Sequence, residues 1–215
     1  KTDMMKLYTY FRSSASYRVR IALHLKGLDF ESVPIHLVKG EQGGAEYLVK
    51  NPQGLVPALD VGGRIITQSL AILDYLENTY PATPLLPHNP LDRANVWAVC
   101  QMIACDTHPL NNLKVLKYLQ QRLAISDDVK QAWYAHWIHE NFAPLENLIQ
   151  RTAGNGCLCD TPPLAFCVLI PQVYNAKRFE VDLSAYPTIT AIDEYCNTLP
   201  AFIKAHPSEQ VDCIK

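Results

Sequence analysis

The sequence has no cysteine among its first 99 residues, although seven cysteines follow from Cys100 onward. Their number is odd and no two of them form a C-x-x-C pair. A zinc site and a disulfide framework both need paired or regularly spaced cysteines, so neither is indicated. We expect the cysteines to be reduced and predict no metal site.

An excess of charge of one sign is also missing, because 19 Lys and Arg residues face 21 Asp and Glu residues. Attraction to nucleic acid backbones or anionic lipid needs a clear basic excess, so neither partner is expected. No apolar run approaches the roughly 18 residues that span a bilayer. The residues Lys1 to Met5 hold no apolar stretch of the signal-peptide kind, and we expect a cytoplasmic protein.

Several catalytic motifs are absent as well. Residues 154–156 (Gly-Asn-Gly) lack the third glycine of a dinucleotide-binding loop, and no G-x-S-x-G hydrolase motif occurs. His136 and His139 lie three residues apart, which is not a metalloprotease spacing, so an ordinary helix face is favoured. Trp133 and Trp137, four residues apart, favour core packing over a stacking platform.

What the sequence does contain begins with alternating strand and helix patterns over about 80 residues. Apolar alternation predicts strands within residues 5–11 and 30–37, and helical spacing predicts a helix ending near Gly27. A short helix within 40–50, a hairpin over 58–66 and a helix from Gln68 to Tyr80 follow. The predicted order is β-α-β-α-β-β-α.

A proline-rich segment then separates two regions of different pattern. Residues 80–90 include four prolines, and such a stiff stretch is typical of a linker. Beyond it, helical spacing without strand alternation predicts an all-α region. We therefore predict an α/β domain over residues 4–83 and an all-helical domain over 90–215, with helices near 93–123, 127–150, 163–177 and 189–199.

Three positions in the first domain could carry chemistry. Ser13 and Ser14 precede the first helix, where hydroxyls either cap the helix or help its N-terminus to stabilise a thiolate. Pro57 either marks a plain strand edge or forms a cis peptide beside a backbone that pairs with an extended ligand. Gln68 and Ser69 begin the last helix, with Ser69 as its N-cap or as a contact for a ligand carboxylate. In this topology all three positions lie at one edge of the sheet.

Together these positions and their surroundings resemble the glutathione transferase superfamily, and specifically its zeta class, the maleylacetoacetate isomerases. The R-S-S-x-x-x-R-V-R-I-A-L and P-Q-V-x-N-A-x-R-F patterns are class-specific, whereas V-P-A-L with Q-S marks the superfamily. The resemblance implies a thioredoxin-like N-terminal domain that binds glutathione, a helical C-terminal domain and a homodimer. The matching segments are residues 10–27, 51–59, 68–77, 105–119 and 170–189.

The resemblance also implies roles for individual residues. The glutathione sulfur would face Ser13 and Ser14, and the other glutathione contacts would come from Val56, Pro57, Gln68, Ser69 and Gln42. Of these, Val56 would pair its backbone with the cysteinyl unit beside cis-Pro57. Gln68 and Ser69 would hold the γ-glutamyl end of glutathione, and Gln42 would lie near its glycyl end. His108 and Asn112 would line the cleft from the helical domain. Arg12 and Arg178 would bind substrate carboxylates, because a guanidinium can pair with both oxygens of a carboxylate.

Two departures from the family pattern stand out. Ala15 replaces the third residue of the usual Ser-Ser-Cys, so with no cysteine before Cys100 the reacting thiol must come from glutathione. Pro163 and Phe166 replace a Thr and an Asp that cap a helix in the family, a loss of about 1 kcal/mol. Asp160 or Thr161 could compensate in part.

The function that follows is a glutathione-dependent cis-trans isomerase of a maleyl diacid, such as maleylacetoacetate in tyrosine and phenylalanine catabolism. Ser13, Ser14, Arg12, Arg178 and His108 would be its catalytic residues. The alternatives are a maleylpyruvate isomerase and a transferase that conjugates or dehalogenates small electrophiles. A non-catalytic binding module is disfavoured because Ser13, Ser14, Gln68 and Ser69 are all present.

Overall fold

The computed structural model describes residues 4–153 and 163–214. The chain forms two compact units, one of Lys1–Leu85 with Asn197–Lys215 and one of Leu86–Cys196. The Gly-Asn-Gly segment and the candidate capping residues Asp160 and Thr161 lie outside the described residues. No helix in the described ranges has the length and apolar character to cross a membrane.

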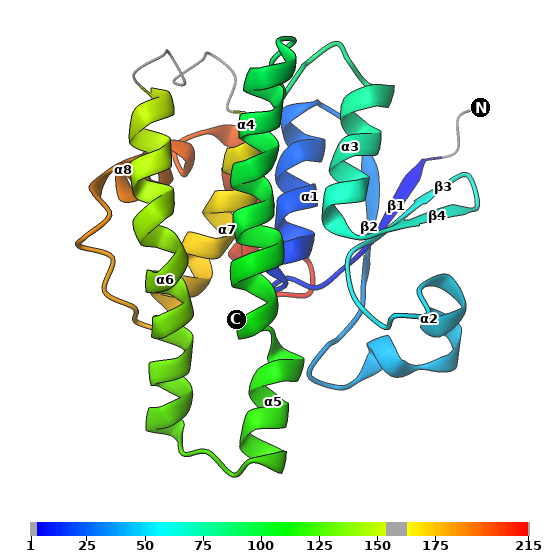
Figure 1. Cartoon of the computed structure of the whole chain (residues 1–215). Helices are drawn as coiled ribbons and strands as arrows, with labels where there is room; N and C mark the ends of the chain where they lie inside the picture. Colours follow the sequence, from blue (N-terminus) through cyan, green and yellow to red (C-terminus); the bar gives the residue numbers. More distant parts are fainter. Residues whose placement is uncertain (1–3, 154–162, 215) are drawn as a thin grey trace. The chain divides into compact units, whose positions relative to one another are not determined.

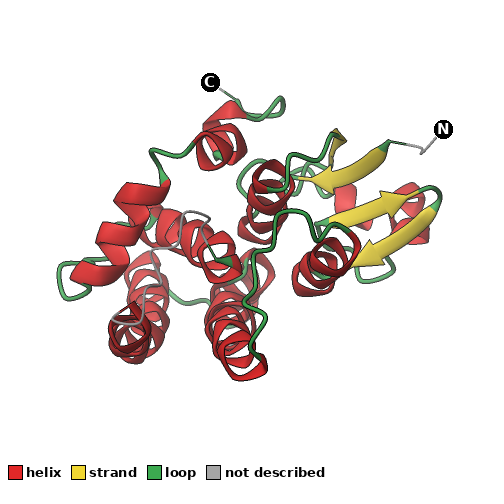
Figure 2. Cartoon of the chain, turned by 90° about the horizontal axis from the view of Figure 1, so that it is seen from above, coloured by secondary structure: helices red, strands yellow, loops and turns green. Residues whose placement is uncertain are grey.

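The first unit is built on a sheet of four strands with the expected β-α-β-α-β-β-α order (Figure 1). The strand order is β2-β1-β3-β4, with β1 parallel to β2 and antiparallel to β3, and β3 antiparallel to β4. Helices α1 and α3 pack against each other on one side of this sheet (Figure 2). The elements are β1 (Met5–Thr9), α1 (Ser14–Leu25), β2 (Phe30–Pro34), η1 (Glu41–Gly43), α2 (Ala45–Lys50), β3 (Ala58–Val61), β4 (Arg64–Thr67) and α3 (Ser69–Thr79).

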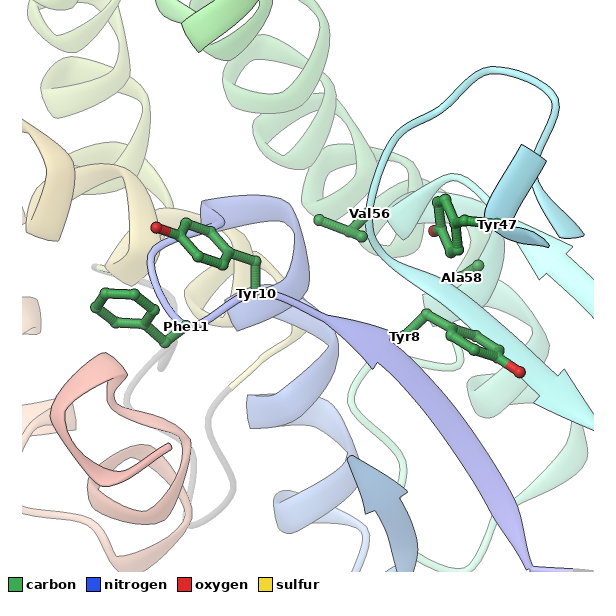
Figure 3. Packing of buried hydrophobic residues seen from close by; sticks show 6 residues of the cluster. All are labelled: Tyr8, Tyr10, Phe11, Tyr47, Val56 and Ala58. Atoms are coloured by element: carbon green, nitrogen blue, oxygen red, sulfur yellow. The ribbon is translucent and has the colours of Figure 1, made fainter. Parts of the chain in front are cut away.

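Aromatic side chains form a core cluster at the end of β1. Tyr8, Tyr10 and Phe11 come from β1 and the residues that follow it, and they are grouped with Tyr47 of α2 (Figure 3). The rings of Tyr10 and Phe11 meet edge to face with their centroids 4.9 Å apart, which is a favoured aromatic geometry. Val56 belongs to the same cluster, so the segment before β3 is packed against the end of β1.

The second unit is entirely helical over its described residues. Periodicity predicts one helix over residues 93–123, but the structure divides this stretch into four pieces, which corrects that expectation. Pro109 has no backbone N–H to continue a helix, and Asn112 caps a new one. The elements are α4 (Pro90–Gln101), the π-helical η2 (Met102–Thr107), η3 (His108–Asn111), α5 (Leu113–Arg122), α6 (Asp127–Ala153), α7 (Leu164–Arg178) and α8 (Pro187–Cys196).

The C-terminal segment packs with the first unit, although the sequence pattern places it in a helical domain over 90–215. Helix α9 (Pro200–Ala205), which periodicity did not indicate, lies against α1, and η4 (Pro207–Glu209) follows it. The backbone N–H of Phe11 donates to Oδ2 of Asp212 at 3.0 Å. The described second unit therefore ends at Cys196, and the last helix of the chain supports the sheet domain.

The proline-rich segment after α3 is held by a buried ion pair. Nζ of Lys26, at the end of α1, lies 2.7 Å from Oε2 of Glu77 on α3, and both side chains are almost fully buried. The same Nζ donates to the carbonyl oxygens of Tyr80 and Thr83, and both Glu77 oxygens accept from the N–H of Leu85. Burying both charges is tolerable because each is paired and hydrogen-bonded.

Candidate functional site

The N-terminus of α1 presents two serine hydroxyls. Ser13 is the N-cap, and its Oγ accepts the N–H of Ser16 at 3.1 Å. A hydroxyl has one hydrogen and two lone pairs, so this cap leaves the hydrogen of Ser13 available. The structure shows no acceptor for that hydrogen among the described residues. Ser14 is the first helical residue and is buried, whereas Ser13 is only half-buried.

The turn before these serines is fixed by Arg20, which the sequence analysis did not single out. Its fully buried guanidinium donates to the carbonyl oxygens of Tyr10 and Phe11 at 3.3 and 3.1 Å. It also donates to Oγ1 of Thr9 at 3.1 Å and to the carbonyl oxygen of Ala205 in α9 at 3.0 Å. Arg20 therefore fixes the last residues before the serine turn and joins them to the C-terminal segment.

Arg12, the residue of this unit that is expected to bind a substrate carboxylate, lies beside the same turn. Arg12 is exposed, and its guanidinium carbon lies 4.8 Å from the centroid of the Phe11 ring. Stacking on an aromatic face leaves the N–H groups at the edge of the guanidinium free to meet a carboxylate. Ala15, which replaces the family cysteine, is half-buried on the first turn of α1.

The segment before β3 carries the second candidate group. The peptide bond between Val56 and Pro57 is cis, which decides between the plain strand edge and the cis peptide that the sequence left open. The carbonyl oxygen of Leu55 accepts from Oη of Tyr47 at 2.6 Å and from Nδ2 of Asn51 at 2.8 Å. Burial raises the pKa of Tyr47 to about 12, so this hydroxyl stays protonated and keeps donating at neutral pH. These two donors hold the chain immediately before Val56.

The third group lies at the start of α3, where the expected N-cap needs correction. Gln68, and not Ser69, occupies the N-cap position, and its side chain makes no capping hydrogen bond. Gln68 has a φ of 69°, an uncommon value for a residue with a side chain, and its Nε2 donates to Oε1 of Gln53 at 2.6 Å. Ser69 is the first helical residue, and its Oγ accepts from Nη1 of Arg18 at 3.0 Å.

Gln42 of η1 is the remaining candidate contact in this unit. It is half-buried, and its Nε2 donates to the carbonyl oxygen of Leu37 at 3.3 Å. Its Oε1 is buried without a hydrogen-bond partner in the described structure. The group that Gln42 can offer a ligand is therefore an acceptor, which suits an N–H donor better than a carboxylate.

In the second unit, His108 and Asn112 lie next to each other at the break between α4 and α5. Nε2 of His108 and Nδ2 of Asn112 are 3.4 Å apart. Asn112 also caps α5, because its Oδ1 accepts the N–H of Lys114 at 3.0 Å. Both side chains lie at the break in the helix and are half-buried, so each remains partly accessible.

Arg178 is the last residue of α7 and is exposed. Its guanidinium carbon lies 4.9 Å from the centroid of the Phe179 ring, and that ring stacks on Tyr134 with centroids 3.8 Å apart. Burial raises the pKa of Tyr134 far above its ordinary value. Arg178 thus resembles Arg12: each is an exposed arginine placed over the ring of a neighbouring phenylalanine.

Other positions noted in the sequence have structural contacts. Nδ1 of His139 lies 2.6 Å from Oη of Tyr186, and the rings of Trp133 and Trp137 meet at 5.7 Å. Both tryptophans are half-buried on α6. Pro163 is the N-cap of α7 and makes no side-chain cap, in line with the family departure at this helix. No group of three or more potential metal ligands occurs among the described residues.

Comparison with known proteins links these features to one family. The family "Glutathione S-transferase, N-terminal domain" matches residues 3–78. A maleylacetoacetate isomerase from Rattus norvegicus is 48% identical over 208 residues, covering 96% of this chain and 94% of the relative. The chain belongs to the zeta class of glutathione transferases. The expected thioredoxin-like domain followed by helices is therefore confirmed.

Two solved structures extend the comparison. A bacterial maleylpyruvate isomerase of the zeta class, in a holo structure, has a TM-score of 0.94 and 42% identity, covering 97% of this chain and all of that one. A maleylacetoacetate isomerase from Anaeromyxobacter dehalogenans has a TM-score of 0.87 and 38% identity, covering 99% and 98%. Its structure holds dicarboxyethyl glutathione and citrate in the active site.

Proposed function

We propose that this protein is a glutathione-dependent isomerase that converts a maleyl diacid into its fumaryl isomer, with maleylacetoacetate as the substrate. The ligand of the A. dehalogenans relative carries the proposal. Dicarboxyethyl glutathione is glutathione whose sulfur is bonded to a carbon of a four-carbon diacid. A site that holds such a compound accommodates both the thiol and the diacid that an isomerase of this kind must bring together.

The side chains of the first unit fit glutathione. Ser13 lies at the start of α1 and Ser69 at the start of α3. Each serine oxygen accepts one hydrogen bond, and neither hydroxyl hydrogen has an acceptor in the described structure. Helix N-termini favour anions, and glutathione carries a thiolate and a γ-glutamyl carboxylate. We assign Ser13 to the sulfur and Gln68 and Ser69 to the γ-glutamyl end. The other contacts of this unit are Ser14, Val56, Pro57 and Gln42.

When bound, glutathione supplies the thiolate that adds to the cis double bond, allows rotation about the resulting single bond and is then eliminated. The residues of this chain act by favouring the ionised thiol. A thiol with a pKa of about 8.5 is only a few per cent ionised near pH 7. The Ser13 hydroxyl and the amides of the first turn of α1 would stabilise the thiolate and lower that pKa. Ser13 suits this role better than Ser14, because it is the less buried of the two.

Two arginines are suited to the diacid. Arg12 and Arg178 are each exposed and each stacked on a phenylalanine, so their charged edges can meet carboxylates. As thiolate adds to the double bond, negative charge develops on the diacid, and fixed cations stabilise it. His108, beside Asn112, is proposed to assist by hydrogen bonding or proton transfer.

The proposal is tested by initial rates with maleylacetoacetate at saturating glutathione. Removing the hydroxyl in Ser13→Ala is expected to lower kcat by roughly tenfold to a hundredfold, the effect of losing one hydrogen bond to a charged group. The matched variant Ser14→Ala should retain more activity. Equal rates in the wild type and both variants would refute thiolate activation by these serines, and no isomerisation of either maleyl substrate would refute the function.

A second substrate is favoured by one observation, since the holo structure that this chain resembles is that of a maleylpyruvate isomerase. The two substrates differ in one acyl tail, so a comparison of kcat/KM on maleylacetoacetate and maleylpyruvate decides between them. A haloacid tests the third activity, conjugation or dehalogenation. If the protein acts on none of these but is retained on immobilised glutathione, it is a binding module.

We also propose a cytoplasmic homodimer that acts in tyrosine and phenylalanine catabolism, without nucleic acid or membrane partners. The resemblance to the zeta class supports the dimer, and the near-neutral charge balance supports the absence of nucleic acid and lipid partners. Sedimentation at micromolar concentration tests the dimer, and a monomer at all concentrations would refute it.

A further inference from the structure

Arg18 is a buried residue of α1 that contacts the start of α3. It is 2% exposed, although charged side chains are rarely so deeply buried without a specific partner. Its Nη1 donates to Oγ of Ser69, 51 residues away in sequence, at a distance of 3.0 Å. Ser69 is itself buried, so water competes little for this hydrogen bond. The guanidinium is thus fixed beside the start of α3.

This contact determines what the Ser69 hydroxyl can do. Arginine has only donors and stays protonated in proteins, so in this pair Oγ of Ser69 must be the acceptor. One lone pair of Oγ is used, and the hydroxyl hydrogen remains to be donated elsewhere. Among the described residues Ser69 makes no other side-chain hydrogen bond. Because the guanidinium can only donate, the hydroxyl hydrogen of Ser69 must point away from Arg18, where it can be donated to another group.

The positive charge of Arg18 acts in the same direction. A hydroxyl that accepts from a cation becomes a stronger donor, since the hydrogen bonds polarise one another. The N-terminus of α3 adds the positive end of the helix dipole, and the Gln68 side chain does not cap it. All these contributions favour a carboxylate at this point over a neutral group.

We infer that Arg18 is a positioning residue that holds Ser69 as a polarised hydrogen-bond donor for the γ-glutamyl carboxylate of glutathione. This inference rests on the proposed binding of glutathione. It extends that proposal by giving a role to a buried residue that need not touch the ligand. It also predicts that Arg18 affects recognition of one carboxylate and not the chemistry of the sulfur.

The test compares two thiols by calorimetric binding. One is glutathione, and the other is γ-aminobutyryl-cysteinyl-glycine, which lacks only the α-carboxylate of the glutamyl residue. The wild type should prefer glutathione, and Arg18→Met should reduce this preference by roughly tenfold, the effect of about 1.4 kcal/mol. Arg18→Lys, which keeps the charge, should restore part of it. In the isomerase assay Arg18→Met should raise KM for glutathione and leave kcat within about threefold.

Two further variants separate positioning from general damage. Ser69→Ala should reduce the preference as Arg18→Met does, and the double variant should be no worse than Ser69→Ala alone, because Arg18 acts through Ser69. Arg20→Met removes the other buried arginine of α1, which does not contact Ser69, and should leave the preference unchanged.

The outcomes distinguish this inference from the proposed function. Equal loss of affinity for both thiols in Arg18→Met, or additive losses in the double variant, would overturn the inference even if the protein is an isomerase. A wild type that prefers glutathione but isomerises no maleyl substrate would refute the function and leave the inference to be decided by binding. A wild type that binds neither thiol would overturn both.

Discussion

Helices α1 and α7 are both largely buried, but they are held in different ways. The buried residues of α1 include Arg18 and Arg20, whose guanidinium groups bind residues of other elements. The buried residues of α7 are mostly apolar, with Gln172 and Asn175 as the exceptions. Hydrogen bonds fix direction, whereas apolar packing does not. A helix that begins at a binding turn therefore uses polar anchors, and a helix that fills a core does not need them.

The ion pairs of the two helices differ in the same sense. Lys26, at the end of α1, is 1% exposed in its pair with Glu77, whereas Lys177 of α7 is 52% exposed in its pair with Asp193. Water reaches the second pair from the side of Lys177, whereas its partner Asp193 is only 5% exposed. In the first pair neither charge could be hydrated without opening the structure.

The largest predicted effect comes from breaking the buried pair. Lys26→Met leaves the Glu77 carboxylate buried without its cation and should lower the free energy of unfolding by about 3 to 5 kcal/mol. Lys177→Met should lower it by less than Lys26→Met does, because Lys177 is half exposed and water reaches its side of the pair. Urea unfolding followed by circular dichroism measures both, and equal losses would contradict the distinction. Tryptophan fluorescence reports on the second unit separately, because Trp97, Trp133 and Trp137 all lie there.

The next largest effect is expected at Arg20. Arg20→Met removes the donor of the Tyr10, Phe11 and Ala205 carbonyl groups and should lower the free energy of unfolding by about 2 to 4 kcal/mol. Because one of these bonds reaches α9, amide exchange in α9 should accelerate more than exchange in α3. Uniform acceleration over the whole first unit would show that Arg20 does not hold the C-terminal segment specifically.

A polar residue of α7 should behave in the opposite way. Gln172 is 1% exposed, and neither its Oε1 nor its Nε2 has a hydrogen-bond partner in the described structure. Gln172→Met has a similar shape and removes the unpaired amide, so it should raise the free energy of unfolding by about 1 kcal/mol. Thermal unfolding checks this. A clear loss of stability would mean that the amide of Gln172 is paired in solution.

The smallest effects concern the first turns of the two helices. Ser13→Ala removes the cap of α1 and should lower the free energy of unfolding by about 1 kcal/mol, with Ser13→Gly closer to the wild type. Pro163 has a φ of −68° and a ψ of 160°, which a capping serine can also adopt. Pro163→Ser should therefore raise the free energy of unfolding by roughly 0.5 kcal/mol. A loss in this variant would show that the fixed φ of proline matters more than a cap.

Much of the fold could be predicted from local pattern. Alternation and helical spacing predicted the β-α-β-α-β-β-α order, and the prolines from Pro81 to Pro90 marked the segment that leads from α3 to α4. Periodicity could not show that residues 102–111 interrupt a long helix, because the apolar spacing continues through the break. It also missed α9, whose six residues are too few to show a helical repeat.

The candidate site was predictable only in part, for a similar reason. Serines at the starts of helices are visible in sequence, and so Ser13 and Ser69 were found. Arg18 and Arg20 were not singled out, although two arginines within the apolar stretch of a helix were a signal that could have been used. Their partners, Ser69 and Ala205, are 51 and 185 residues away.

The sequence by itself therefore determined the order of elements, the absence of a protein thiol near the first helix and the presence of serines at helix starts. These properties depend on residues that are neighbours along the chain. Only the tertiary structure decided that Gln68 and not Ser69 is the N-cap, that a buried arginine donates to Ser69, and that the C-terminal segment supports the serine turn. Each of these depends on which atoms meet across the fold, and spacing along a chain does not encode that.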